Sequence, residues 1–403
     1  MPATEVAIVG AGPVGGTLAL LLAEAGIATA LVDRAPLPPM EHPDFDGRAY
    51  AIAAGSRAVL ERAGLWDALP YPPGPIADIR VSDGRLGRSP SRLHLHFSAE
   101  DPAAPFGHMV EARSLRMALN RRLAATPLVR LHAPAEVDVD RTGDLARLTI
   151  AGGDTLTARL VVAADGRDSP LRRQADIPVT HLPYRQTAIV CAIAHARPHH
   201  GLALEHFLPA GPFAQLPMHD TPDLAGGADR HVSAIVWTDR MQQADQLMRL
   251  DDARFTEELS RRLGPHLGAI SLAGRRWSYN LSALLVHRLT APRLALVGDA
   301  AHGIHPIAGQ GLNLGFRDIE ALAGLIVQAV AADADPGAAA LLARYQAARR
   351  PANLAMLLAT DALDRLFSND FPPVRLARDL GLAAVHRMPR LKQLFVRHAT
   401  GQT

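Results

Sequence analysis

Residues 6–33 read VAIVGAGPVGGTLALLLAEAGIATALVD, and this stretch decides the fold. The apolar run at residues 6–9 predicts a buried strand, and residues 29–32 predict a second one. Between them, residues 17–25 are rich in alanine and leucine, which favours a helix. The order of strand, glycine turn, helix and strand predicts a β-α-β unit within a parallel sheet.

The turn after the first strand carries the pattern G-x-G-x-x-G. Its glycines permit a tight turn, close backbone approach to a pyrophosphate and close helix packing, while the helix N-terminus attracts the anion. An aspartate after the second strand can accept hydrogen bonds from ribose hydroxyls. An ordinary glycine turn with a solvated aspartate is the alternative, and the pattern alone does not distinguish FAD from NAD. The unit is expected to contact its cofactor through Gly10, Gly12, Pro13, Val14, Gly15, Asp33 and Arg34.

Composition limits the classes of protein that this chain can be. The 403 residues, 48% of them hydrophobic, can bury a large core over two to three domains. A net charge of +2 does not favour nucleic acid as a partner. The single cysteine, Cys191, excludes an internal disulfide and indicates a reducing compartment. No apolar run is long enough to span a bilayer, and the N-terminus does not resemble a signal peptide, so we expect a cytoplasmic protein.

A second glycine-rich region follows the apolar run at residues 294–297. It begins with GDAAH at residues 298–302 and continues with HPIAGQGLN at residues 305–313, before a predicted helix at residues 315–330. An aspartate at a strand end can bind a ligand hydroxyl, and glycines at a helix N-terminus expose N–H groups that stabilise negative charge. Either segment alone could be a purely structural turn. Their joint presence favours a cofactor site, with contacts from Gly298, Asp299, Pro306, Gly309, Gly311, Leu312 and Asn313.

These motifs together resemble the aromatic-hydroxylase class of FAD monooxygenases. The resemblance rests on GAGPVGG, GDAAH and HPIAGQGLNLGFRD, and the last of these is similar to the signature of the ubiquinone-biosynthesis hydroxylases. It extends to residues 44–66, 163–173 and 185–218, and so covers most of the chain. The resemblance implies that Asp299 binds the ribityl chain and that Gly311, Leu312 and Asn313 lie against the isoalloxazine.

The resemblance also assigns three residues that the sequence pattern alone leaves open. It implies that Arg48 and Arg113 lie near the cofactor, whereas both would otherwise be interpreted as solvated surface arginines. Residues 165–172 match the D-G-x-x-S-x-x-R element of the family, which is linked to FAD and to the reduced nicotinamide. Asp165 is therefore an expected cofactor residue, and a turn stabilised by aspartate side chains is the alternative.

We expect an α/β fold: a Rossmann-type FAD-binding domain with an inserted, mostly antiparallel β-sheet substrate domain and a C-terminal helical region. The expected FAD-binding domain comprises residues 1–70, 101–180 and 286–345. Residues 71–100 are an excursion into the substrate domain, and residues 181–285 form its sheet with one helix near residues 253–263. The helical region covers residues 346–403 and is expected to break at Pro351, Pro372, Pro373 and Pro389.

The resemblance implies hydroxylation of a polyprenylated phenol or quinone precursor of ubiquinone with molecular oxygen, through a flavin C4a-hydroperoxide, with NAD(P)H as electron donor. The alternatives are a hydroxylase of a soluble aromatic metabolite and a non-catalytic flavin-binding assembly protein. Basic and apolar residues alternate after residue 374. One interpretation is a segment that lies peripherally on the inner face of the membrane or binds a quinone-biosynthesis complex. The alternative is a packed helix.

Several polar residues receive no catalytic role from the sequence. His94, His96, His199 and His200 lack a third ligand at a convincing spacing, so we expect no metal. Cys191 lies in an apolar run and is interpreted as a core residue. Glu205 and His206 border either the substrate cavity or an exposed sheet edge. No general base, hydroxylated ring carbon, tail length or oligomeric state follows from the sequence.

Overall fold

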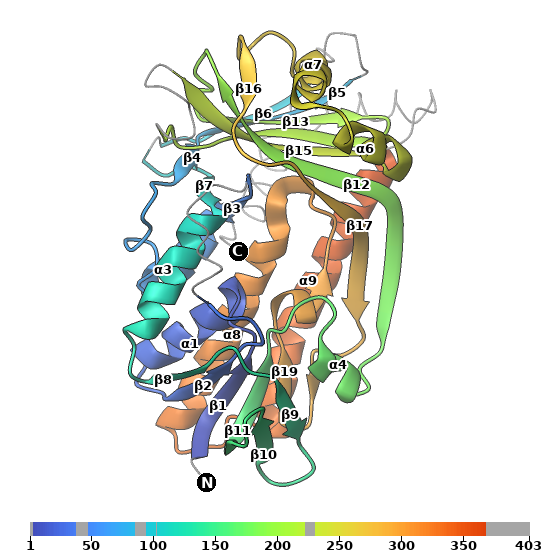
Figure 1. Cartoon of the computed structure of the whole chain (residues 1–403). Coiled ribbons are helices and arrows are strands. Elements are labelled where there is room, and N and C mark those ends of the chain that lie inside the picture. Colours follow the sequence, from blue (N-terminus) through green and yellow to red (C-terminus); the bar gives the residue numbers. More distant parts are fainter. Residues whose placement is uncertain (1–2, 38–46, 85–93, 102, 222–229, 368–403) are drawn as a thin grey trace.

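A mostly parallel sheet forms the lower half of the molecule in Figure 1, which shows a computed structural model. The structure describes residues 3–37, 47–84, 94–101, 103–221 and 230–367. The order of the sheet is β18-β19-β11-β1-β2-β8. Its strands are β1 (Ala3–Val9), β2 (Thr29–Val32), β8 (Val129–His132), β11 (Thr155–Ala163), β18 (Thr290–Ala291) and β19 (Leu294–Leu296), with β9 (Val137–Asp140) and β10 (Ala146–Ile150) beside β11.

Strand β1 lies between β2 and β11 and is parallel to both, with Ile8 opposite Leu31 and Val162. The strand order therefore reverses beside β1, and in open α/β sheets ligands bind outside the carboxyl ends of the strands at such a point. Both glycine-rich regions follow carboxyl ends of this sheet, one after β1 and the other after β19. The topology thus brings together two motifs that lie almost 290 residues apart in the sequence.

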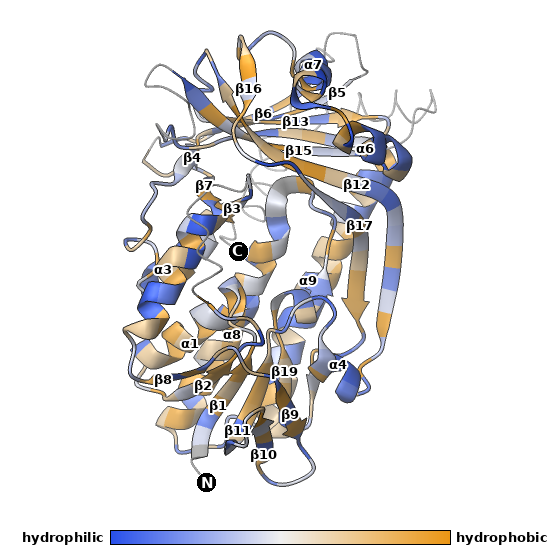
Figure 2. Cartoon of the chain, viewed as in Figure 1, coloured by the Kyte–Doolittle hydropathy of each residue, from blue (hydrophilic) through white to orange (hydrophobic). Residues whose placement is uncertain are grey.

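Helices cover the parallel sheet and share its apolar core. They are α1 (Pro13–Glu24), α2 (Ala54–Arg62), α3 (Ala112–Ala124), α4 (Pro170–Gln174), α8 (Gln310–Ala331) and α9 (Ala339–Phe367), with the short 3-10 helices η2 (Gly298–Ala300) and η3 (Ile307–Gly309) before α8. The core joins β1 residues such as Ile8 to Leu18 of α1 and Phe316 of α8, all without exposed surface. Figure 2 shows the apolar colours on the central strands and hydrophilic colours on α4.

A second, larger sheet forms the upper half of the molecule (Figure 1). Its order is β20-β17-β12-β15-β14-β13-β5-β6, and every neighbouring pair is antiparallel except β13 and β5. The strands are β5 (Asp78–Asp83), β6 (His94–Ser98), β12 (Val179–His195), β13 (Leu202–Leu208), β14 (Gly211–Pro217), β15 (His231–Arg240), β17 (Trp277–Val286) and β20 (His302–Gly303), with β16 (Ile270–Leu272) beside β12.

The two faces of the second sheet have different neighbours. Helices α6 (Met241–Met248) and α7 (Asp252–Leu263) cover one face, where Trp237, Phe255 and the fully buried Cys191 share a core. The opposite face shares a cluster with Ala49 and Ala51 of a small sheet formed by β3 (Ala49–Ala53), β4 (Gly74–Ile76) and β7 (Gly107–Glu111). This second face therefore looks toward the half of the molecule that carries the glycine motifs.

The expected fold is confirmed, with two corrections. The region between residues 181 and 285 contains α6 as well as the expected α7, because α6 is only 8 residues long and gives a weak periodic signal. Helix α9 does not break at Pro351. A proline inside a helix costs about 3 kcal/mol, but buried hydrogen bonds of Arg349 and Asn353 to Asp318 hold both sides of Pro351 in place. The expected domain boundaries stay a prediction. Strands β5 and β6, from the expected excursion at residues 71–100, do lie in the second sheet.

No described helix is both long enough and apolar enough to cross a membrane. The expected breaks at Pro372, Pro373 and Pro389, and the basic segment that contains them, lie outside the described residues.

Candidate active site

The first glycine turn is shaped by close backbone contacts. Gly10 has φ +106°, and a side chain there would overlap the carbonyl oxygen of Ala164. A Cβ at Gly15 would overlap the carbonyl oxygen of Gly10 and lie 2.8 Å from Cβ of Ala164. A Cβ at Gly12, by contrast, would have no neighbour within 4 Å. Gly10 and Gly15 are therefore required by the fold itself, while Gly12 leaves open space at the N-terminus of α1, where Pro13 and Val14 begin the helix.

Asp33 closes this turn from the end of β2. Its Oδ2 accepts a hydrogen bond from the N–H of Ala11 at 2.6 Å, and its Oδ1 accepts one from the N–H of Ala35 at 2.8 Å. Each carboxylate oxygen has a further lone pair, so these bonds leave acceptor capacity for ribose hydroxyls. The neighbouring Arg34 is exposed.

Arg116 is a residue of this site that the sequence reasoning missed. Its guanidinium donates to the carbonyl oxygen of Ala11 at 2.8 Å, which places a cation directly on the glycine turn. Burial lowers its pKa, while nearby Tyr50 and Asp33 raise it and Arg48 lowers it further. The signal was an arginine one helical turn after Arg113, but helical arginines are too common for that spacing to indicate a site.

The two arginines assigned by the resemblance lie in different environments. Arg48 is exposed and stacks over Trp277, with its guanidinium carbon 5.1 Å from the ring centroid. Arg113 is buried, donates to Glu111 at 2.6 Å and lies 4.0 Å from the ring centroid of Tyr71. The interpretation of Arg113 as a solvated surface residue is therefore wrong, because the first turn of α3 packs against β7 and against Tyr71 in the segment between α2 and β4.

The second glycine region packs directly onto the first. Gly298 has φ +59°, and a Cβ on it would lie 3.2 Å from Val14 of α1; a Cβ on Gly315 would lie 2.7 Å from the same side chain. This close approach brings Asp299, whose side chain is exposed, to the same edge of the sheet as the open space at Gly12. The structure thus places Asp33 and Asp299 on the two sides of the N-terminus of α1.

Asn313 fastens the N-terminus of α8 to strand β3. Its Oδ1 accepts from the N–H of Ala53 at 2.9 Å, and its Nδ2 donates to the carbonyl oxygens of Ala51 at 2.8 Å and Gly309 at 3.2 Å. Both N–H groups of the amide and one lone pair of its oxygen bond to backbone groups, so Asn313 positions the loop. Gly309 adopts φ +60° and bonds back to Pro306, Leu312 packs partly buried against the core, and a Cβ on Gly311 would have no neighbour within 4 Å.

The turn at residues 165–172 links the two glycine regions. Asp165 accepts a hydrogen bond from the N–H of Leu171 at 3.2 Å, and burial raises its pKa. Arg172 donates to the carbonyl oxygen of Ala300 at 3.0 Å and to that of Arg167 at 2.8 Å. These contacts agree with the alternative of a turn held by its own side chains, and they also place Asp165 directly after β11, beside Gly10.

Asp318 is the centre of a buried network behind the second glycine region. Its Oδ2 lies 2.6 Å from Nε2 of His302 and accepts from the N–H of Gly298 at 3.2 Å. Its Oδ1 accepts from Arg349 at 2.9 Å and from Asn353 at 3.2 Å. Burial alone would raise the pKa of Asp318, but His302 and Arg349 more than offset this and hold it below its ordinary value. The network ties GDAAH to α8 and α9.

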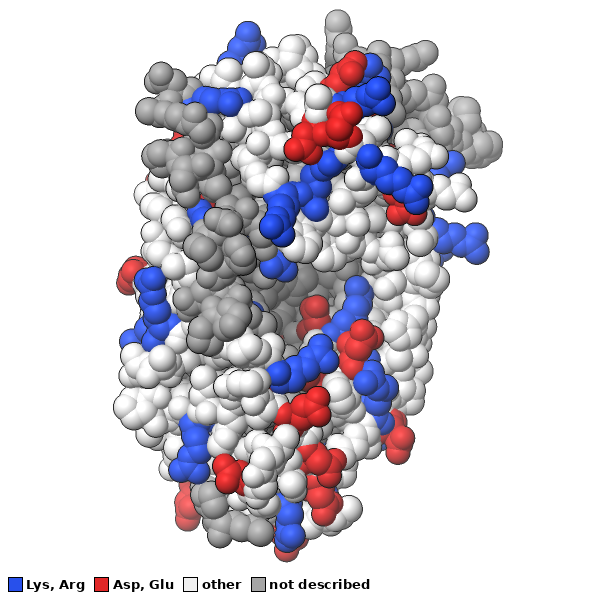
Figure 3. All heavy atoms as spheres, in the orientation of Figure 1, with Lys and Arg blue, Asp and Glu red and all other residues white. Residues whose placement is uncertain are grey.

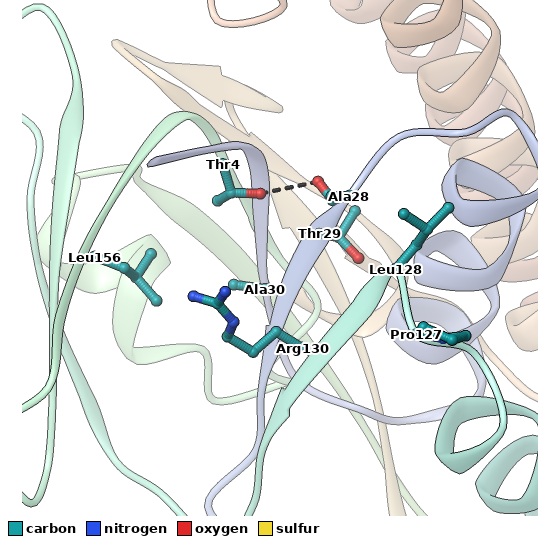
Figure 4. A pocket seen from close by; sticks show the side chains of 8 residues that line it. All are labelled: Thr4, Ala28, Thr29, Ala30, Pro127, Leu128, Arg130 and Leu156. Carbon is teal, nitrogen blue, oxygen red and sulfur yellow. Dashed lines mark hydrogen bonds between the residues drawn. The ribbon is translucent and has the colours of Figure 1, made fainter. Parts of the chain in front are cut away.

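Two hollows can be compared. Figure 3 shows a depression between the two halves of the molecule, with basic and acidic residues at its rim. The pocket in Figure 4 lies elsewhere: it is lined by residues such as Thr4, Thr29 and Arg130, near the amino ends of β1, β2 and β8. That pocket is separated from the glycine turns by the length of the strands, so it is not part of the same site.

A family model described as an FAD binding domain matches residues 3–360. The chain belongs to this FAD-binding family. It is 48% identical to "Ubiquinone hydroxylase UbiL" of Rhodospirillum rubrum over 398 residues, which is 98% of this chain and 89% of that protein. It is 34% identical to "3-demethoxyubiquinol 3-hydroxylase" of Escherichia coli over 405 residues, which is 99% of this chain and 98% of that protein.

The solved structures agree on the fold. The crystal structure of p-nitrophenol 4-monooxygenase PnpA from Pseudomonas putida matches with a TM-score of 0.76 over the whole of both chains, at 18% identity. A likeness at this identity shows the fold alone. The relatives by sequence place this FAD-binding chain among the ubiquinone hydroxylases of the flavoprotein monooxygenase class, so the resemblance seen in its motifs is confirmed. The protein is an FAD-dependent aromatic hydroxylase.

Proposed function

We propose that this FAD-dependent hydroxylase acts on the aromatic ring of a polyprenylated phenol or quinone precursor of ubiquinone, with molecular oxygen as co-substrate and NAD(P)H as electron donor. The observation that carries the proposal is 48% identity over nearly the whole chain to a protein named as a ubiquinone hydroxylase. The loop from Pro306 to Asn313, called the flavin loop below, lies near an apolar face of the second sheet, because Ile307 of this loop shares a cluster with Phe207 of β13.

The described residues fit FAD, and we propose the following contacts. The N-terminus of α1 at Gly12 takes the pyrophosphate, because its open space and free N–H groups suit an anion. Asp33 takes the adenosine ribose and Asp299 the ribityl hydroxyls. The loop from Pro306 to Asn313 takes the isoalloxazine. FAD, when bound, activates molecular oxygen; the protein orients the substrate ring and excludes water.

The remaining residues in the proposed set surround these contacts. Arg116, which already holds the glycine turn, joins them as a positioning residue. The remaining residues of the proposed set, besides Arg116, are Gly10, Pro13, Val14, Gly15, Arg34, Arg48, Arg113, Asp165, Gly298, Gly309, Gly311 and Leu312.

Replacing Asp299 tests the cofactor assignment. Asp299 is exposed, so Asp299→Ala should leave the unfolding temperature of the FAD-free protein unchanged. Loss of a charge-assisted hydrogen bond should weaken FAD by roughly 1.5 to 3 kcal/mol, about tenfold to somewhat over a hundredfold in Kd. Fluorescence titration of the stripped protein with FAD measures this. Asp144→Ala, at an exposed aspartate in the turn between β9 and β10, is the control, and an unchanged Kd for Asp299→Ala would remove that residue from the site.

A tail-length series tests the substrate. Each buried methylene is worth about 0.8 kcal/mol, so each enclosed isoprene unit should raise kcat/KM until the enclosed part of the channel is full. We expect kcat/KM to rise over the first one or two units and then to level off, measured with phenols of increasing tail length and with peroxide recorded in parallel. Equal efficiency with an unprenylated phenol would contradict the ubiquinone-precursor assignment while leaving the flavin hydroxylase intact.

We also propose that the protein works in the cytoplasm, peripherally on the inner face of the membrane. The support is the alternation of basic and apolar residues after residue 374, and the prenylated substrate, whose tail partitions into lipid. Binding to anionic vesicles that falls as salt rises would support this, because screening weakens surface attraction; binding that salt does not change would count against it.

A further inference from the structure

Glu205 is an acidic residue on the face of the second sheet that looks toward the flavin loop. It lies in the middle of β13, paired with Val81 of β5 and Ala214 of β14. Side chains alternate along a strand, so Ala203 and Phe207 share its face while Leu204, His206 and Leu208 lie on the other. The alternation holds in the packing, because Leu208 belongs to the core beneath α6 and α7, and Phe207 does not.

The two neighbours of Glu205 on this face lie against elements of the proposed flavin site. Phe207 clusters with Ile307, which belongs to the loop before α8, and stacks on Phe367 at the end of α9, with ring centroids 4.1 Å apart. Ala203 belongs to the cluster that contains Ala51, and Ala51 is bonded by Asn313. Same-face residues lie about 7 Å apart along a strand. On this face Glu205 therefore lies between Ala203, which shares a cluster with Ala51 of β3, and Phe207, which shares a cluster with Ile307.

The surroundings of Glu205 are apolar. Val81 and Leu95 belong to the same cluster as Phe207. Glu205 as a whole residue is half-buried. Burial of its carboxylate raises its pKa to about 7, and no charged group among the described residues contributes to this shift.

The titratable groups on neighbouring elements have other contacts. His206, on the opposite face, is 2.8 Å from the hydroxyl of Ser82, and the nearby Asp83 of β5 raises the pKa of His206 against the effect of burial. His305 lies 3.6 Å from Asp364 of α9 and 3.3 Å from Gln186. Asp83 pairs with Phe207 at the end of β5 and is buried, whereas Glu205 lies in the middle of β13 on the face toward the flavin loop.

We infer that Glu205 accepts the proton of the ring hydroxyl of the phenolic substrate, an inference that rests on the proposed function. In this step the phenol O–H bond breaks, its electron pair stays on the oxygen and the proton moves to the carboxylate. No oxidant or reductant takes part. The negative charge on the phenol oxygen enriches the ring carbon that receives oxygen, and the proton then returns to solvent. A base with a pKa near the working pH suits such a transfer.

Glu205→Gln tests the inference with Glu100→Gln, at an exposed acidic residue, as the matched control. With a farnesylated phenol at pH 8, Glu205→Gln should lower kcat by about a hundredfold, within the range for loss of a general base. The flavin absorbance and the Kd for FAD should not change. Wild-type kcat should fall as pH drops through about 7, because the carboxylate then binds a proton, and the variant should lack this dependence. Glu205→Asp should restore part of the rate.

A second substrate separates proton transfer from a structural role. A farnesylated nitrophenol is already ionised at pH 8, so Glu205→Gln should oxidise it at nearly the wild-type rate. An equal loss of rate with both phenols would overturn the inference.

The stability of the FAD-free protein gives a readout without turnover. The folded pKa of Glu205 lies above the ordinary value of 4.5, so the folded state holds more protons than the unfolded state between these values. Wild type therefore loses stability from this group as pH rises from 4.5 to about 7. The melting temperature of Glu205→Gln should exceed that of wild type at pH 8 and not at pH 4.

If wild type hydroxylates no prenylated phenol, the proposed function fails. If wild type does hydroxylate one and Glu205→Gln matches wild type in every measurement, only the inference fails.

Discussion

Gly15→Ala should nearly abolish FAD binding and destabilise the fold, whereas Gly12→Ala should impair only FAD binding. A Cβ at Gly15 overlaps the carbonyl oxygen of Gly10, which is backbone and cannot rotate away. Overpacking costs about 1 to 3 kcal/mol and occasionally more, and we expect a value near the upper end because two backbone segments must move. A displaced turn also loses its alignment with the pyrophosphate, so Kd for FAD should rise roughly a hundredfold or more.

Gly12 supplies the matched comparison. Its φ of −67° suits alanine, and a Cβ there meets nothing within 4 Å in the protein. The melting temperature of FAD-free Gly12→Ala should therefore stay near that of wild type, while the methyl group occupies the space assigned to the pyrophosphate and weakens FAD. Thermal unfolding with and without FAD separates the two variants. Normal FAD affinity in Gly12→Ala would show that the cofactor does not approach this turn.

Asp318→Asn should cause a large loss of stability. Asp318 is fully buried between His302 and Arg349, and removing one partner of a buried ion pair costs about 3 to 5 kcal/mol because the other charge stays uncompensated. Denaturant unfolding measures the loss. The control is Glu61→Gln, which removes the exposed pair with Arg57 and should cost at most about 1 kcal/mol.

The pH dependence of this effect has a defined sign. The folded pKa of Asp318 lies below its ordinary value of 3.8, so its stabilising contribution is fully present above 3.8 and is lost as pH falls through the folded value. The difference in unfolding free energy between wild type and Asp318→Asn should therefore shrink in acid. A small difference at neutral pH would contradict a central role for the network.

The sequence predicted those parts of the site that depend on local backbone geometry. The turn at residues 10–15 and the loop at residues 298–313 are predictable because glycine spacing reports where backbone segments must approach each other, as Gly10 and Gly298 do in the structure. The β-α-β unit was predictable for the same reason, since its strands are short, apolar and bounded by turns.

Long-range contacts were not predictable. Nothing near Asp318 in the sequence indicates that α9 returns Arg349 and Asn353 to it, or that this contact carries the helix through Pro351. The roles of Arg116 and Glu205 depend on residues far away in the chain, so their neighbours in the sequence do not indicate them. The face of β13 that meets the flavin loop depends on strand register, which a single isolated strand of seven residues does not specify.

Incorporation of isotopically labelled oxygen tests the central claim most directly. The FAD-loaded protein is supplied with NAD(P)H, labelled molecular oxygen and a prenylated phenol, and the product is analysed by mass spectrometry. We predict one labelled oxygen atom on the aromatic ring of the product, formed only with FAD bound. Reduced cofactor consumed with release of peroxide alone, and no label in any prenylated phenol, would contradict the assignment of this protein as a hydroxylase of ubiquinone precursors.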